Sequence, residues 1–166
     1  MHRNSLADAG IRLLQESDVP AVLEVITKAR TEYGMAERLD SVLEPADRDL
    51  NRTYRRQRAA YFVAIEAARI VGGAGIAPLA DSDDQTCELQ RMYLLSERRG
   101  CGIGAQLLNA CLSAARGFGY RRCYAETIEE MQGAIRFYEN NGFQALAHPM
   151  GNTGHHHNDC WLIRDL

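Results

Sequence analysis

The feature that most constrains the fold is a glycine-rich loop at residues 98–105, which reads Arg-Arg-Gly-Cys-Gly-Ile-Gly-Ala. Residues 86–95 before it have extended character, and apolar residues follow it at helical spacing: Ile103, Leu107, Leu108, Cys111, Leu112 and Ala115. Glycines in such a loop open a helix whose first amides lack internal partners and sit at the positive end of the helix dipole. The sequence therefore predicts a site for a chain of phosphates between a strand and a helix.

Three glycine motifs compete for this loop. A P-loop requires a Lys and a Ser or Thr after its last glycine, and neither is present. The dinucleotide fingerprint fits the spacing of residues 100–105, and Glu126 lies where its ribose-binding acid would be. That motif follows an almost entirely apolar parallel strand, however, whereas the strand here carries Glu88, Gln90 and Arg91.

The third motif is the Arg/Gln-x-x-Gly-x-Gly/Ala loop of the GCN5-related N-acetyltransferases (GNAT), which residues 99–104 resemble. Residues 134–143 are similar to the second signature of that family, a short helix that carries a Tyr and ends at Gly-Phe. Glu88 stands at about the position of a glutamate that several members use as a base. The resemblance runs over essentially the whole chain from Ile11 onward.

The resemblance implies one GNAT domain of the α/β (α+β) class over residues 11–166, preceded by an extension at residues 1–10. Its sheet would be mixed, mostly antiparallel, with about seven strands flanked by about four helices. Local patterns predict strands at 11–14, 61–65, 70–76, 86–95, 122–127, 143–147 and 160–163. They predict helices after Ser17 or Asp18, from Glu44-Pro45, and over 103–116 and 131–140.

Composition narrows the functional classes. The 166 residues, 46% hydrophobic and 25% charged, suit one globular domain. A net charge of −3 provides no basic field for nucleic acid, and no apolar run is long enough for a membrane helix. Five cysteines without a Cys-x-x-Cys pair favour a reducing compartment, so we expect a cytoplasmic protein. The family resemblance allows a homodimer.

The resemblance also implies acetyl-coenzyme A as cosubstrate. The main chain of the loop would bind its pyrophosphate, and the main chain of a preceding strand would bind its pantetheine arm; these residues are Arg99, Gly100, Cys101, Gly102, Ile103, Gly104 and Ala105, and Met92, Tyr93 and Leu94. Tyr138 would be the general acid, since a phenol is neutral at pH 7 and can protonate a thiolate. Glu88 would be the general base if burial raised its pKa. The alternatives are a core aromatic for Tyr138 and a surface ion pair for Glu88.

The sequence predicts the acceptor less specifically than the cosubstrate. Glu32, Tyr33, Arg91 and His155 are candidate pocket residues, and their mixed charge suggests a small polar or zwitterionic amine such as an amino-acid derivative. Peptide N-termini and lysines stay open as alternatives. The tract at residues 154–160 is rich in His and contains Cys, but adjacent histidines on an extended chain point in different directions, so we predict no metal.

These observations predict an N-acetyltransferase that transfers acetyl from acetyl-coenzyme A by direct attack of an amine in a ternary complex. A second class is a non-catalytic acyl-coenzyme A sensor with the same fold. A pure binder needs neither Glu88 nor Tyr138, so the presence of both favours the enzyme. A nicotinamide dinucleotide-binding protein is the third alternative.

Overall fold

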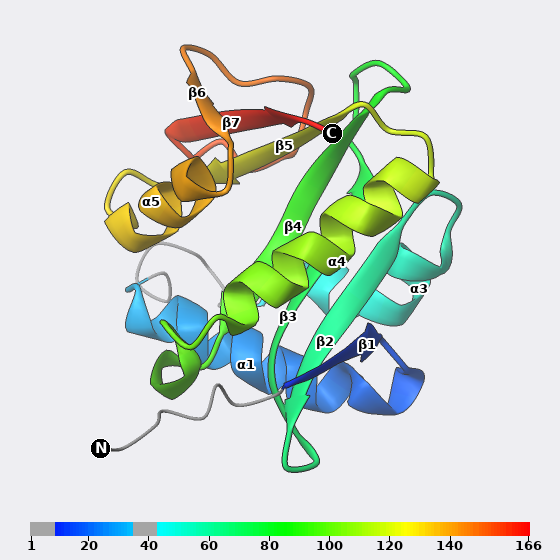
Figure 1. Ribbon diagram of the computed structural model, residues 1–166, viewed down its shortest axis with the longest axis vertical. Coiled ribbons are helices and arrows are strands. Elements are labelled where there is room, and N and C mark those ends of the chain that lie inside the picture. Colours follow the sequence, from blue (N-terminus) through cyan, green and yellow to red (C-terminus); the bar gives the residue numbers. More distant parts are fainter. Residues whose placement is uncertain (1–8, 35–42) are drawn as a thin grey trace.

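A computed structural model describes residues 9–34 and 43–166, and in this part of the chain seven strands form one sheet (Figure 1). The strand order is β1-β2-β3-β4-β5-β7-β6. The strands are β1 (Gly10–Leu13), β2 (Ala60–Glu66), β3 (Arg69–Pro78), β4 (Thr86–Leu94), β5 (Arg122–Thr127), β6 (Gln144–Leu146) and β7 (Cys160–Asp165). All neighbours are antiparallel except β4 and β5. The predicted mixed, mostly antiparallel sheet is confirmed.

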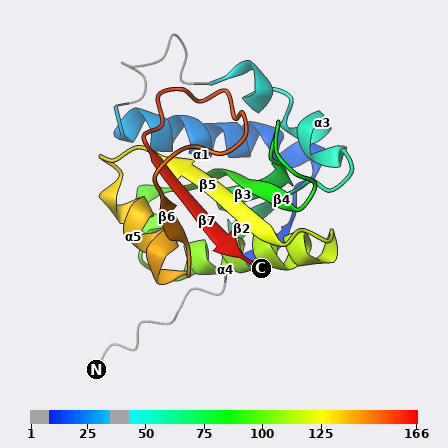
Figure 2. The ribbon, with the colours of Figure 1, turned by 90° about the horizontal axis from the view of Figure 1, so that it is seen from above.

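Helices cover both faces of the sheet, as Figure 2 shows. They are α1 (Val19–Glu32), α3 (Leu50–Arg55), α4 (Ile103–Gly117) and α5 (Gln132–Asn140). The apolar stripe of α4 lies fully buried against the sheet, as its periodicity predicted, whereas α1 packs on the opposite face. Over residues 9–34 and 43–166, no helix combines the length and apolar character needed to cross a bilayer.

The predicted start of one helix is wrong. The pair Glu44-Pro45 opens only a single 3₁₀ turn, η2 (Pro45–Asp47), and α3 begins later, at Leu50. The amide of Glu44 donates to the Asp47 carboxylate at 2.8 Å, which closes the turn. The same carboxylate is fully buried and also accepts hydrogen bonds from the guanidinium groups of Arg30 and Arg91. This tertiary contact holds Asp47 in place and overrides the local preference for a longer helix.

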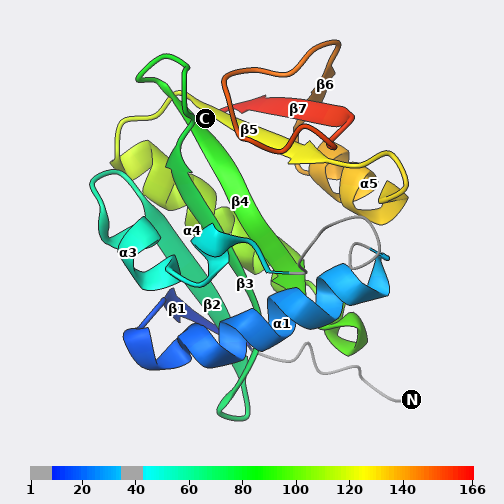
Figure 3. The same ribbon diagram turned by 180° about the vertical axis from the view of Figure 1, so that it is seen from behind.

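The parallel pair β4 and β5 separates along its length, as Figure 3 shows. Their paired register runs only from Thr86↔Arg122 to Glu88↔Tyr124. Beyond Glu88, β4 contains a bulge: the β3 register jumps from Gly73↔Tyr93 to Gly75↔Gln90, and Arg91 has a φ of +50°. The divergence and the bulge open the sheet where the predicted site residues lie.

Two tyrosines hold the bulge through hydrogen bonds from their hydroxyl groups. The Tyr54 hydroxyl donates to the Gln90 side chain at 2.9 Å, and the Tyr61 hydroxyl donates to the Arg91 carbonyl at 3.0 Å. Their rings pack with centroids 5.0 Å apart over β3, where Gly73 and Gly75 leave room for them. These β3 glycines therefore make room for the two tyrosines that hold the bulge in β4.

We expect Gly75→Ala to lower the free energy of unfolding by about 1–3 kcal/mol, the usual cost of overpacking a core. An added Cβ would lie 2.6 Å from Cε1 of Tyr54 and 2.7 Å from Cδ2 of Tyr61. Urea denaturation measures the effect. Gly117→Ala in α4 is the matched control, because no atom lies within 4 Å of its added Cβ. An unchanged urea midpoint for Gly75→Ala would contradict this account of the two tyrosines.

Candidate active site

Two cavities meet where β4 leaves β5. The larger cavity, about 490 Å³, lies between the glycine loop, the end of β4 and α5. The smaller cavity, about 110 Å³, lies between β4, β5 and the connection from β6 to β7. Five residues line both: Met92, Tyr93, Met131, Ala134 and Tyr138. A ligand in the larger cavity can therefore touch one in the smaller cavity at this boundary.

The glycine loop presents unpaired amides to the larger cavity. Gly100 and Gly102 have φ values of +74° and +84°, a backbone shape that glycine adopts without strain. The first internal hydrogen bond of α4 is donated by Gln106, and the amides of residues 100–105 have no acceptor in the described part of the chain. They lie at the positive end of the α4 dipole, so the loop is suited to bind an anion.

Most of the predicted cosubstrate residues line the larger cavity: Met92, Tyr93, Leu94, Arg99, Gly100, Gly102, Gly104 and Ala105. Cys101 and Ile103 are not in its wall, and the side chain of Ile103 is fully buried in the core. These two residues can contribute only main-chain groups. The Arg99 guanidinium donates to the Leu94 carbonyl at 3.1 Å, which ties the loop to the end of β4.

Tyr138 is the buried residue at the boundary. It is 8% exposed and packs between the rings of Phe137 and Phe143. Within residues 9–34 and 43–166 no hydrogen bond reaches its hydroxyl, whose oxygen is open to the two cavities that Tyr138 lines. Burial raises the pKa of this phenol above its ordinary value, so it stays protonated at neutral pH. A neutral, unpaired hydroxyl is suited to give a proton to a ligand.

Glu88 stands at the last position of β4 that pairs with β5. It is 5% exposed, and its Oε2 accepts a hydrogen bond of 2.6 Å from the Gln90 side chain. Burial is the main cause that raises the pKa of Glu88, and the charge of nearby Glu126 raises it further. A carboxylate with a raised pKa accepts a proton more readily than a surface glutamate. The surface ion pair considered from the sequence is not what the structure shows.

Glu126 and His155 join Glu88 in one cluster. One ligand atom from each of the three residues lies within 4.8 Å of the others, a spacing that suits a metal ion or an ammonium group. The predicted absence of metal therefore stays a prediction. Glu126 accepts hydrogen bonds from Tyr124 at 2.7 Å, Thr153 at 2.8 Å and Asn158 at 3.0 Å. It thus ties the β6–β7 connection to β5.

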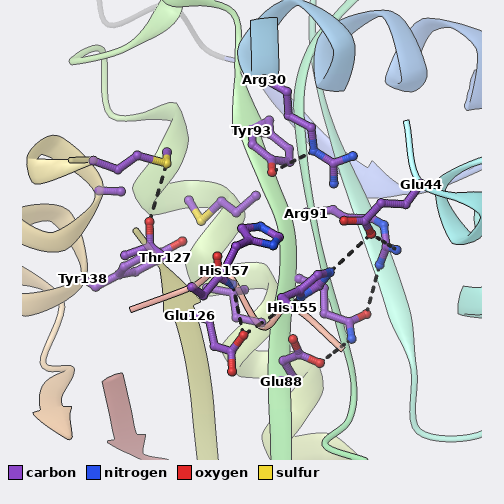
Figure 4. Close-up of a pocket in the computed structure, with 16 residues that line it drawn as sticks. Arg30, Glu44, Glu88, Arg91, Tyr93, Glu126, Thr127, Tyr138, His155 and His157 are labelled. Carbon is purple, nitrogen blue, oxygen red and sulfur yellow. Dashed lines mark hydrogen bonds and ion pairs between the residues drawn. The ribbon is translucent and has the colours of Figure 1, made fainter. Parts of the chain in front are cut away.

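His155 lies between Glu44 and Glu126 (Figure 4). Its Nε2 is 3.2 Å from Glu44 Oε2, and its Nδ1 is 4.0 Å from Glu126 Oε2. The hydrogen bond to Glu44 raises the pKa of His155, and the same bond lowers the pKa of Glu44 to about 2. The pair therefore favours a carboxylate beside an imidazolium.

Behind the smaller cavity lies a buried ion network. Asp47 accepts hydrogen bonds from Arg30 and Arg91, whose side chains are 5% and 8% exposed. Arg30 also donates to the Tyr93 hydroxyl at 3.1 Å. The network links α1, η2 and the β4 bulge, so it fixes one wall of the cavity.

The structure separates the four predicted acceptor residues. Arg91 and His155 line the smaller cavity. Tyr33 lines the larger cavity instead, and Glu32 pairs with Arg99 of the glycine loop at 2.6 Å. Both residues lie at the end of α1 beside the glycine loop, and neither lines the cavity that contains Glu88.

Sequence reasoning missed several residues of the smaller cavity and its network: Arg30, Glu44, Asp47 and Glu126. From the sequence, Glu126 was considered only as the ribose-binding acid of the dinucleotide motif. That alternative needs a parallel sheet, and β4 and β5 are the one parallel pair among the described strands. Pairing β5 beside β4 in parallel would have placed Glu126 near Glu88.

Solved structures show the same fold. A GNAT acetyltransferase from Staphylococcus aureus superposes with a TM-score of 0.80 at 21% identity, over 95% of this chain and 99% of that one. The PaiA N-acetyltransferase of Thermoplasma acidophilum, solved in complex with coenzyme A, superposes with a TM-score of 0.76 at 19% identity, over 96% and 99%. At these identities the likeness establishes the fold.

Sequence comparison establishes the family. The chain is 37% identical over 157 residues to the uncharacterized N-acetyltransferase YjgM of Escherichia coli, with 94% of each chain covered. It is 32% identical over 98 residues to N-acetyltransferase 8F1 of Rattus norvegicus, which covers 58% of this chain and 44% of that one. The profile of the Acetyltransferase (GNAT) family matches residues 22–143. The protein is therefore an acyltransferase enzyme that belongs to the Acetyltransferase (GNAT) family.

Proposed function

We infer that the protein is an N-acetyltransferase that moves the acetyl group of acetyl-coenzyme A to the amine of a small polar molecule, by direct attack in a ternary complex. One observation carries the inference. The run of unpaired amides at residues 100–105 borders a cavity that meets an acidic cavity at Tyr138. A phosphate-bearing donor and an amine can thus be held together.

The larger cavity fits the donor. Its amides suit a pyrophosphate, and the apolar side chains of Met92, Leu94 and Phe137 suit a pantetheine arm. Gly104 faces this wall, and a Cβ there would lie 3.4–3.6 Å from Leu94, Phe137 and Met92. The coenzyme A complex of the similar Thermoplasma acidophilum protein supports this assignment.

Glu88 is the proposed base. An amine enters as its ammonium form and must lose a proton before its nitrogen lone pair can attack the thioester carbonyl carbon. Oε2 of Glu88 is held by Gln90, and the carboxylate takes that proton. The C–N bond then forms, and the carbonyl π electrons move to the oxygen. The proton on Glu88 later leaves to solvent.

Tyr138 is the proposed acid. When the carbonyl forms again, the C–S bond breaks and its electron pair stays on sulfur. The Tyr138 hydroxyl gives its proton to this thiolate, and the proton that the amide nitrogen still has to lose restores the phenol. One ammonium and one thioester thus yield one amide, one thiol and one released proton.

The test of the function is acetyl-coenzyme A-dependent thiol release with a panel of amino acids, polyamines, aminoglycosides and short peptides, beside a control without acceptor. We expect release with at least one amine. In parallel, acetyl-coenzyme A should raise the melting temperature in a concentration-dependent way, and NAD should not. Stabilisation without release from any amine would favour a non-catalytic acyl-coenzyme A sensor.

We expect Glu88→Gln to lower kcat/KM by about 100-fold, the lower range for loss of a general base. In the native protein kcat/KM should rise with pH as Glu88 loses its proton, at a pH above the ordinary pKa of glutamate, because burial raises the pKa. The variant should lose this acid limb. Glu16→Gln, at a side chain 77% exposed, is the matched control. A pH profile identical to the native one would remove Glu88 from the mechanism.

A further inference from the structure

Carboxylates outnumber guanidinium groups around the smaller cavity. Glu44, Glu88 and Glu126 line it, with Asp47 directly behind, whereas the fixed cations are Arg30 and Arg91. Two negative charges are left over when Glu88 is ionised, and His155 compensates one of them as an imidazolium. His157 also lines the cavity, with its ring centroid 6.0 Å from that of His155. The cavity of the described residues is therefore suited to a ligand group of positive charge.

The cations are already engaged by protein groups. Arg91 donates to Asp47 through Nε and to the Tyr54 hydroxyl through Nη1 at 3.2 Å, and its Nη2 is 3.8 Å from Glu44. Arg30 donates to Asp47 and to Tyr93, and His155 contacts Glu44. A ligand carboxylate would have to compete with Asp47 and Glu44 for these cations, and it would meet the charges of Glu88 and Glu126 in the same cavity.

A second observation locates the ligand. Tyr138 is more than nine-tenths buried, its hydroxyl has no partner in residues 9–34 and 43–166, and it lines the same cavity as Glu88. The only hydrogen bond to the Glu88 carboxylate in these residues reaches Oε2, so Oε1 is available to a ligand. The reacting nitrogen therefore lies among Glu44, Glu88 and Glu126. Any substituent on the carbon next to that nitrogen lies in the same acidic cavity.

We propose that the acceptor is an alkylammonium whose reacting amine has no carboxylate on the adjacent carbon, such as the end of a diamine or the side-chain amine of lysine. The proposal rests on the proposed function and narrows it. In an α-amino acid the carboxylate is one carbon from the amine, so it would enter the acidic cavity and meet Glu88 and Glu126. The amino-acid derivatives considered from the sequence fit only through a side-chain amine.

The test compares pentylamine with norleucine, which differ only by the carboxylate, in acetyl-coenzyme A-dependent thiol release by the full chain. We expect kcat/KM for pentylamine to exceed that for norleucine at least tenfold, and lysine to give N6-acetyllysine by mass spectrometry. A higher kcat/KM for norleucine, or N2-acetyllysine as product, would overturn the acceptor class and leave the proposed function standing. Turnover of neither amine would overturn the acceptor class, and failure of the wider amine panel as well would overturn the function.

A variant tests the charge itself. Glu126→Gln removes one negative charge from the cavity without touching the Glu44 hydrogen bond that keeps His155 charged, so the preference for pentylamine should shrink at least threefold. A purely structural role would lower both rates and leave their ratio unchanged, which would contradict the proposal. Glu24→Gln, on the exposed side of α1 beside Lys28, should leave rates and ratio as they are. Turnover that EDTA abolishes and Zn²⁺ restores would place a metal ion in the cluster and would also overturn the proposal.

Discussion

Tyr138→Phe is expected to lower kcat by about 100-fold and to leave the affinity for acetyl-coenzyme A unchanged, because it removes only the hydroxyl that we propose as the proton donor. The ring keeps its packing between Phe137 and Phe143, so the fold and the boundary of the two cavities are retained. No hydrogen bond within the described residues is lost with the hydroxyl, so the free energy of unfolding should not fall. Steady-state thiol release gives kcat, and calorimetric titration gives the affinity.

Tyr120→Phe is the matched control. Tyr120 is buried to a similar extent, but its hydroxyl donates to the Arg58 carbonyl at 2.9 Å and lines neither cavity. This variant should lose about 1 kcal/mol of stability, the usual value of one hydrogen bond, and keep its turnover. Native turnover in Tyr138→Phe would show that Tyr138 is a core aromatic, which is the alternative that its helical spacing allowed.

Asp47→Asn is expected to lower the free energy of unfolding by about 3–5 kcal/mol, the cost of leaving a buried charge without its partner. Asp47 is fully buried and is shared by Arg30 and Arg91, so the substitution removes the carboxylate that both guanidinium groups contact. The neutral amide keeps the size of the side chain, so packing alone does not explain a loss of this size. Urea denaturation, with the slope compared between variants, measures it.

Asp49→Asn provides the control for this variant. Asp49 is two residues further along the chain, its side chain is 55% exposed, and its contact with Arg52 is 3.8 Å long. An exposed pair of this kind contributes little to stability. A loss below about 1 kcal/mol for Asp47→Asn would show that solvent or neighbouring groups replace the carboxylate, and that the network is weaker than its burial implies.

The parts of the fold that local sequence determines were predicted well. The stripe from Ile103 to Ala115 is a helix because its apolar residues repeat with the helical period, and the glycines before it allow the turn that opens it. The strand ends differ from prediction by only one or two residues, since turn residues mark them. The positions of Glu88 and Tyr138 beside the cavities followed from the family resemblance.

The smaller cavity could not be predicted in the same way, because its walls come from pairs distant in sequence. Arg91 is 44 residues from Asp47, and His155 is 111 residues from Glu44. Local periodicity does not report such contacts. The same reason explains why Glu32 and Tyr33 do not line the smaller cavity. Their position depends on how α1 packs across β3 and β4, which local sequence does not determine.

The two cavities share a boundary on β4 and α5 but differ in their other walls. The larger one is completed by the glycine loop and the start of α4. The outer wall of the smaller one comes from Glu44, beside η2, and from the connection between β6 and β7, which lies on the α1 side of the sheet (Figure 2). If the smaller cavity holds the acceptor as we propose, the connection at residues 147–159 contributes to acceptor choice but not to the wall of the larger cavity. Exchanging residues 147–159 for another sequence should then change the preferred amine and leave the binding of acetyl-coenzyme A in place.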